Sequence, residues 1–222
     1  MAIVSRRAAV ALLTAAPALG AASSAGAVQG LTAGRVPGVS PEADDSGFYT
    51  YKRPEGKSGG HGVGWTEIPR YSFKVPEGWG ETPVSIADLG GTEIDLRFAD
   101  KQEGNLMVVV APVARFSDIP PNADVRINEL APPGRILSGF APELFGSPLD
   151  EEDVLEARVL VKEGLSYYEW AVRPHRLVSA TAVGNRLLIL SVSARNAHAW
   201  RKHENVLRTI QSSFAVPKPG EA

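Results

Sequence analysis

The C-terminal half of the chain repeats one pattern four times: a short run of apolar and β-branched residues ends at a turn signal. The runs are 153–162 (DVLEARVLVK), 165–172 (LSYYEWAV), 176–183 (RLVSATAV) and 186–194 (RLLILSVSA). The breaks between them hold Gly164, Pro174 and the pair Gly184-Asn185. Strand-length runs separated by such short breaks predict antiparallel strands joined by tight turns. The sequence therefore predicts an antiparallel meander in this half of the chain.

More strands are expected upstream. The segments 71–75, 84–89 and 93–98 have the composition of strands, and Gly90-Gly91 between the last two is a hairpin signal. The segment 105–111 (NLMVVVA) is almost continuously apolar, which fits a strand buried on both faces. These strands and the meander together predict one extended sheet.

Two segments carry the spacing of helices. The first is 134–146, although Pro142 makes it irregular. In the second, 196–214, apolar and aromatic residues recur at three- and four-residue steps on one face, and Asn196 is a suitable N-cap. Strands with one helix among them and another at the end predict an α+β fold, in which helices cover an antiparallel sheet.

Residues 1–27 have the three parts of an export signal. Arg6 and Arg7 precede an apolar run that is shorter than the about 20 residues needed to cross a bilayer, and Ala25-Gly26-Ala27 offers a cleavage site. The paired arginines indicate the twin-arginine export route. A buried N-terminal helix is the alternative, and Pro17 argues against it because proline disrupts a helix interior.

The remaining chain is expected to hold one domain. Residues 28–46 are rich in small and polar residues and predict a flexible linker, 47–216 the domain, and 217–222 a C-terminal tail. The net charge is −2 for the whole chain and −4 without residues 1–27, which excludes non-specific nucleic-acid binding through a basic surface. The chain has no cysteine, so it has no disulfide, thiolate metal site or cysteine nucleophile.

The sequence contains no catalytic motif in the structural context that its chemistry requires. In the Gly-rich stretch 55–64, the phosphate-loop pattern fails because Tyr51 stands where its first glycine should be. The serine-hydrolase spacing G-x-S-x-G occurs at 56–60 (GKSGG), but no strand is expected to run into this loop and no helix to leave it, as a nucleophile elbow requires. His198 and His203 point about 140° apart on a helix and do not readily chelate one ion. We therefore expect a protein without catalytic residues that is not an enzyme.

Four consecutive acidic residues form a candidate cation site: Asp150, Glu151, Glu152 and Asp153. Calcium takes about six to eight oxygen ligands, and such a run can supply two or three of them. The alternative is a solvated acidic turn in front of a strand. Calcium is the only cofactor that the sequence brings into consideration.

Four basic residues gather in one Gly-rich segment of this acidic chain: Lys52, Arg53, Lys57 and His61. The segment has few apolar residues, which argues against a role in core burial. We interpret it as a mobile loop that docks on an acidic partner surface, where complementary charge raises the association rate. The alternative is a loop that only adds solubility.

Five segments, in this order, resemble the PsbP-like proteins of the photosynthetic thylakoid lumen. They are YSFKVPEGW (71–79), GNLMVVVAPV (104–113), VKEGLSYYEWAV (161–172), HRLVSATAVGNRLLILSVSA (175–194) and AWRKHENVLRTIQSSFAV (199–216). The resemblance implies an antiparallel sheet sandwiched by helices, an α/β/α sandwich. It also implies delivery to the chloroplast thylakoid lumen by the twin-arginine route, with the bacterial periplasm as the alternative location.

The resemblance further implies a non-enzymatic photosynthesis protein that is peripheral to the membrane. The best-known relative is an extrinsic subunit of the oxygen-evolving complex of photosystem II, where it helps to retain calcium. This sequence departs from that subunit in its Gly-rich loop at 56–64 and in its N-terminal segment. We therefore expect a paralogue that acts as an accessory or assembly factor and binds photosystem subunits on the lumenal face. A lumenal protein that binds calcium or a small ligand is the alternative.

Overall fold

The computed structural model describes residues 35–57, 68–84, 92–118, 120 and 123–217. Its strands are β1 (Phe48–Lys52), β2 (Ser72–Pro76), β3 (Gly80–Glu81), β4 (Glu93–Asp100), β5 (Gly104–Pro112), β6 (Val154–Lys162), β7 (Leu165–Val172), β8 (Arg176–Val183) and β9 (Arg186–Ala194). Its α-helices are α1 (Ile127–Leu130), α2 (Pro133–Phe145) and α3 (Ala197–Ser213).

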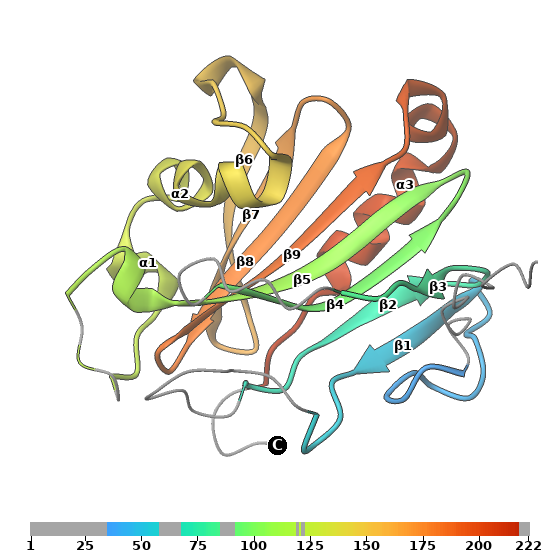
Figure 1. Cartoon of the computed structure of the whole chain (residues 1–222), viewed down its shortest axis with the longest axis horizontal. Coiled ribbons are helices and arrows are strands. Elements are labelled where there is room, and N and C mark those ends of the chain that lie inside the picture. The colour runs from blue at the N-terminus through green and yellow to red at the C-terminus, as the bar shows by residue number, and fades with distance from the viewer. Residues whose placement is uncertain (1–34, 58–67, 85–91, 119, 121–122, 218–222) are drawn as a thin grey trace, which may run out of the picture.

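Seven of the strands form one antiparallel sheet in the order β3-β4-β5-β9-β8-β7-β6 (Figure 1). The predicted meander is confirmed, because β6 pairs with β7, β7 with β8 and β8 with β9. β5 lies inside the sheet between β4 and β9, and nearly all of its residues are buried, as predicted for 105–111. β1 and β2 pair with each other as a separate two-stranded sheet.

The close approach of β5 to β9 requires a glycine at the start of β5. A Cβ atom on Gly104 would lie 2.1 Å from the carbonyl oxygen of Ser193, which is well inside van der Waals contact. Any other residue would force these two strands apart at this end of their pairing.

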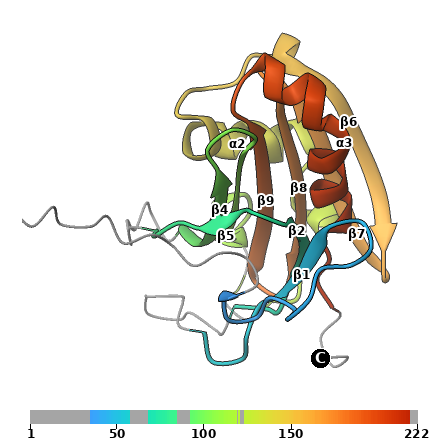
Figure 2. The same ribbon diagram turned by 90° about the vertical axis from the view of Figure 1, so that its right-hand side faces the viewer.

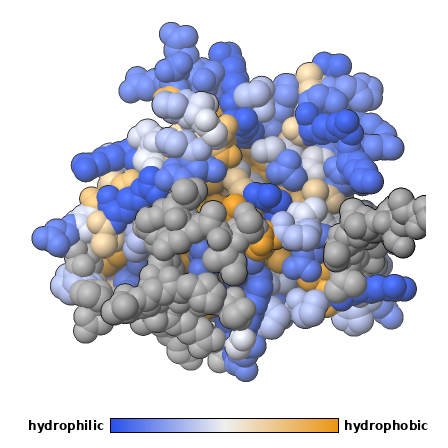
Figure 3. Space-filling model, in the orientation of Figure 1, coloured by the Kyte–Doolittle hydropathy of each residue, from blue (hydrophilic) through white to orange (hydrophobic). Residues whose placement is uncertain are grey.

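Helices cover both faces of the large sheet (Figure 2). On one face α3 and the β1–β2 sheet share a core with β4, β5 and β7, built on residues such as Phe73, Leu207 and Phe214. On the other face α1 and α2 pack on β5, β7, β8 and β9 through residues such as Leu137 and Phe140. The predicted fold, an antiparallel sheet sandwiched by helices, is confirmed. In a space-filling view of the α2 side, hydrophobic residues show near the middle and hydrophilic residues surround them (Figure 3).

Both predicted helices are present. α3 begins after Asn196, whose Oδ1 accepts a hydrogen bond from the backbone N–H of Ala199 at 2.9 Å, so Asn196 is the N-cap. Leu207 and Ile210 on its inner face are buried. Trp200, on the same predicted face, is only partly buried and stacks on His175 with ring centroids 5.6 Å apart.

The folded domain begins earlier than predicted. Val36 is 4% exposed and lies in the core, although 28–46 was expected to be a linker. The N–H of Ser40 donates to the carbonyl of Thr50 at 2.8 Å, and the N–H of Thr50 donates to Ser40 Oγ at 3.0 Å. These contacts attach residues 36–40 to β1, so this part of the expected linker belongs to the domain.

Several predicted features lie wholly or largely outside the described residues. They are the export signal at 1–27, the strand at 84–89 and its hairpin at Gly90-Gly91. Within the described ranges, no helix combines the length and the apolar character needed to cross a membrane.

Candidate docking surface

A buried carboxylate organises the segment that we expected to be a docking loop. Asp95 in β4 has a side chain that is 1% exposed. Arg53 donates to both of its oxygens, from Nε to Oδ2 at 3.0 Å and from Nη2 to Oδ1 at 3.2 Å. The hydroxyl of Tyr71 also donates to Asp95. The carboxylate is thereby held by a charge-assisted bidentate pair and a phenol, which together offset the cost of its burial.

Lys57 closes this cluster from the solvent side. Its Nζ donates to the backbone carbonyl of Asp95 at 2.6 Å and lies 3.3 Å from the Oδ2 atom. Arg53 Nη2 in turn donates to the carbonyl of Lys57 at 2.9 Å. Burial lowers the pKa of Lys57 and the nearby Asp95 carboxylate opposes that change, while burial raises the pKa of Tyr71 well above its usual value.

The structure corrects the interpretation of four cations on an exposed loop. Arg53 is 3% exposed and cannot reach a partner without local unfolding, and Lys57 is committed to Asp95. Lys52, the neighbouring residue of β1, is exposed. His61 lies outside the described residues. A docking role for this region stays a prediction, and of the four residues it now rests on Lys52.

A hollow of about 310 Å³ lies beside the Asp95 cluster. Its walls include Lys52, Arg70 and Glu163 together with the buried Tyr71. The Arg70 side chain is 41% exposed and forms an ion pair with Glu55. Lys52 and Arg70 are both accessible at this hollow, and the buried Arg53–Asp95 pair orders the backbone next to Lys52. Such a surface suits an anionic group of a partner.

A larger and more open depression, of about 770 Å³, lies where β5 begins and β9 ends. Its walls include Lys101, Arg176 and Arg195, with His175 and Asn196 beside them. Arg176 also lies over the ring of Phe145, 4.6 Å from its centroid. No pattern within a single stretch of sequence indicates this depression, because residues of four separate segments form it.

The acidic run forms a surface turn. Glu151–Asp153 is a single 3-10 turn in front of β6, in which the N–H of Asp153 donates to the carbonyl of Asp150. Asp150, Glu151 and Glu152 are exposed. Across the described part of the chain, no three acidic or histidine side chains converge to hold a metal ion. Calcium binding at this run stays a prediction.

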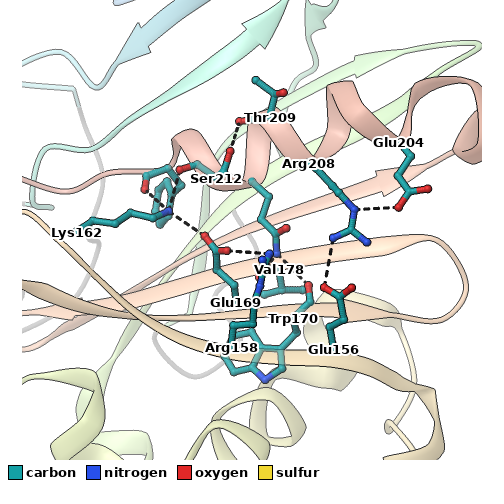
Figure 4. Close-up of polar contacts among 12 residues, drawn as sticks. Glu156, Arg158, Lys162, Glu169, Trp170, Val178, Glu204, Arg208, Thr209 and Ser212 are labelled. Atoms are coloured by element: carbon teal, nitrogen blue, oxygen red, sulfur yellow. Dashed lines mark hydrogen bonds and ion pairs between the residues drawn. The ribbon is translucent and has the colours of Figure 1, made fainter.

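A polar seam joins β6 and β7 to α3 (Figure 4). Glu169 in β7 is 3% exposed, and Lys162 Nζ donates to it at 2.8 Å, while Arg158 Nη2 lies 3.5 Å away. Lys162 Nζ also donates to the backbone carbonyl of Ser212 at the end of α3, at 2.8 Å. One lysine of β6 thus holds a buried carboxylate of the sheet and the last turn of the helix.

The seam continues along α3 away from Lys162. Arg208 donates from Nε to Glu204 at 2.9 Å and from Nη1 to Glu156 of β6 at 3.4 Å. The buried Gln211 donates from Nε2 to the carbonyls of Trp170 and Val178 at 3.0 and 2.8 Å. β6 is therefore fastened to the helix along its inner side.

The outer side of β6 has a different character. In the described ranges, the large apolar side chains that are exposed all belong to this strand: Leu155, Val159 and Val161, at 55%, 61% and 69%. The sequence pattern alone does not indicate that these side chains are exposed, because an alternating strand does not reveal whether it lies at the edge of a sheet.

Comparisons with known proteins place these observations in a family. The PsbP family model matches residues 67–216. PsbP domain-containing protein 4, chloroplastic, from Arabidopsis thaliana is 51% identical over 189 residues, which cover 85% of this chain and 71% of that protein. PsbP domain-containing protein 6, chloroplastic, from the same plant is 23% identical over 164 residues, covering 67% and 61%.

Among solved structures, the solution structure of cyanobacterial PsbP from Synechocystis sp. PCC 6803 has a TM-score of 0.49 and 21% identity. The match covers 74% of this chain and 99% of that one. The family model spans most of the described residues, and a chloroplastic relative shares half of its aligned residues with this chain. The chain therefore belongs to the PsbP family.

Proposed function

We propose that this chain is a non-enzymatic protein of the chloroplast thylakoid lumen that attaches to the lumenal side of a photosystem complex. There it acts as an accessory or assembly factor, not as a stoichiometric subunit. The observation that carries the proposal is the 51% identity to a chloroplastic PsbP-domain protein over 85% of this chain. The export signal predicted at 1–27 supports the lumen as the destination.

The proposed docking surface is the hollow beside the Asp95 cluster. Lys52 and Arg70 border it, and the buried pair of Arg53 and Asp95 fixes the backbone that carries Lys52. A backbone that is already ordered adds little to the entropic cost when its cations meet an acidic surface. Contacts of this kind orient the partner and weaken with salt, because the screening length falls from about 10 Å at 0.1 M to about 3 Å at 1 M.

The test is a membrane-retention assay across a salt series, combined with native gel electrophoresis of thylakoid complexes. The variant Lys52→Glu/Arg70→Glu should leave the membrane at lower salt than the wild type. The control Arg201→Glu/Lys202→Glu makes the same charge change at exposed positions on α3 and should behave as the wild type.

Equal retention of the two double variants would show that docking does not use this hollow. Wild-type protein that migrates with no photosystem complex on the native gel would overturn the proposed association itself.

A further inference from the structure

The two edges of the large sheet are unequal. One edge is β3, which has only two residues, and the other is β6, which has nine. A long edge strand presents unpaired N–H and C=O groups, and proteins usually protect such an edge by shortening or covering it. β3 is protected by its length, whereas β6 is long and carries the exposed side chains of Leu155, Val159 and Val161.

The apolar residues of β6 continue a covered part of the sheet. In the register with β7, Val159 lies opposite Tyr168 and Ala157 lies opposite Trp170. Tyr168 and Trp170 belong to the core beneath α1 and α2, and the Tyr168 hydroxyl donates to the carbonyl of Ala131 at 3.2 Å. Helices α1 and α2 cover β7 but leave Val159 and Val161 of β6 exposed. These two valines are therefore the uncovered edge of this apolar face of the sheet.

On its opposite face, β6 is held in place by polar contacts with α3 and β7. Glu156 lies 3.4 Å from Arg208, and Lys162 binds both Glu169 and the carbonyl of Ser212. These contacts order the strand before any partner arrives, which lowers the entropic cost of adding another strand to it.

We propose that β6 pairs with β6 of a second copy of this chain, antiparallel about a twofold axis, so that the two sheets become one. The sequence of the strand is self-complementary in the register centred on Val159. That register sets Val159 opposite itself and Ala157 opposite the second copy's Val161, which joins the two apolar edges.

The charges agree with the same register. Centring on Val159 sets Glu156 opposite the second copy's Lys162, so opposite charges face each other on the α3 side. Centring one residue earlier, on Arg158, would bring two arginines together, which is unfavourable. Because strand pairing alone buries less than the about 800 Å² per partner of a standard interface, the dimer is weak and forms at micromolar concentration.

The experiment measures oligomeric state and register together. Sedimentation velocity of the full chain, from low to high micromolar concentration, should show a monomer–dimer equilibrium. Val159→Lys places two lysines opposite each other and should give a monomer throughout. Asn205→Lys adds the same charge at an exposed position of α3 and should dimerise as the wild type.

The absence of native cysteine allows a second readout that does not depend on Val159→Lys being folded. Val159→Cys should cross-link to a covalent dimer on mild oxidation, because the residue faces its own copy, and Asn205→Cys should remain monomeric. A wild type that stays monomeric at high micromolar concentration and a Val159→Cys that does not cross-link would overturn the proposal. A shift in mass seen only when another thylakoid protein is added would also overturn it and assign the edge to that protein.

Discussion

Asp95 and Arg53 meet in a part of the core where neither side chain reaches solvent. Their pairing decides where the segment that follows β1 lies, because Arg53 and Lys57 both turn inward to the same carboxylate. The two partners are separated by 42 positions in the sequence, and Arg53 stands among glycines and other cations. A local pattern contains no sign of a partner so distant, which is why the sequence predicted an exposed basic loop here.

We expect Arg53→Ala to lower the free energy of unfolding by up to about 3–5 kcal/mol, because the buried Asp95 carboxylate loses its bidentate partner and keeps only the ion pair with the partly exposed Lys57 and the hydrogen bond from Tyr71. Urea denaturation followed by circular dichroism measures this change. The double variant Arg53→Met/Asp95→Leu removes both charges and should cost clearly less. A loss below about 1 kcal/mol for Arg53→Ala, which is typical of surface substitutions, would show that the pair is open to solvent.

In β4 the sequence pattern predicts the strand correctly but not which face of the sheet each residue lies on. The segment 93–98 was predicted to be a strand, and it is one. The register with β5 shifts between Ile94 and Leu96, so these two residues join cores on opposite faces of the sheet, although simple alternation would place them together. The strand could be predicted from its composition, but a bulge depends on the neighbouring strand and could not.

The meander and the final helix could be predicted from the sequence because local residues determine them. Their turns and caps are local, as in the break at Gly164 and the cap at Asn196. The pairing of β5 with β9 and the edge position of β6 are global properties of the sheet order. No spacing within a segment specifies them.

We expect Asn196→Ala to lower the free energy of unfolding by about 0.5–2 kcal/mol, because α3 loses the side-chain oxygen that accepts from the N–H of Ala199. Asn196→Asp keeps an acceptor at the same position and should remain close to the wild type. Urea denaturation of the three proteins separates these outcomes. Equal losses for both variants would mean that the side-chain amide acts in some other contact.

The folded domain as a whole begins before residue 47, the start that the sequence predicted. Val36 lies in the core, and Ser40 exchanges two hydrogen bonds with Thr50. The small and polar composition of 28–46 predicted a linker because it lacks periodicity. A single buried valine and a few backbone contacts are enough to anchor such a segment, and composition does not reveal them.

A chain that starts at Gly47 should therefore be less stable than one that starts at Arg35. The loss includes about 1.5–3 kcal/mol for the missing burial of the Val36 side chain, in addition to the contacts of Ser40. Chemical denaturation of the two truncated proteins under the same conditions measures the difference. Indistinguishable midpoints would mean that residues 35–46 pack too loosely to contribute.

The place of β5 inside the sheet, between β4 and β9, also affects how the protein is made. β5 finds β4 immediately, but its other neighbour, β9, is the last strand to leave the ribosome. Until β9 is made, one side of the almost wholly apolar β5 has no partner strand. The pairing of β5 with β9 must close a loop that includes β6, β7 and β8, and such non-local pairing is slow. During synthesis the hairpin of β4 and β5 is thus the segment most in need of a chaperone, and a chain that ends before β9 would retain that need permanently.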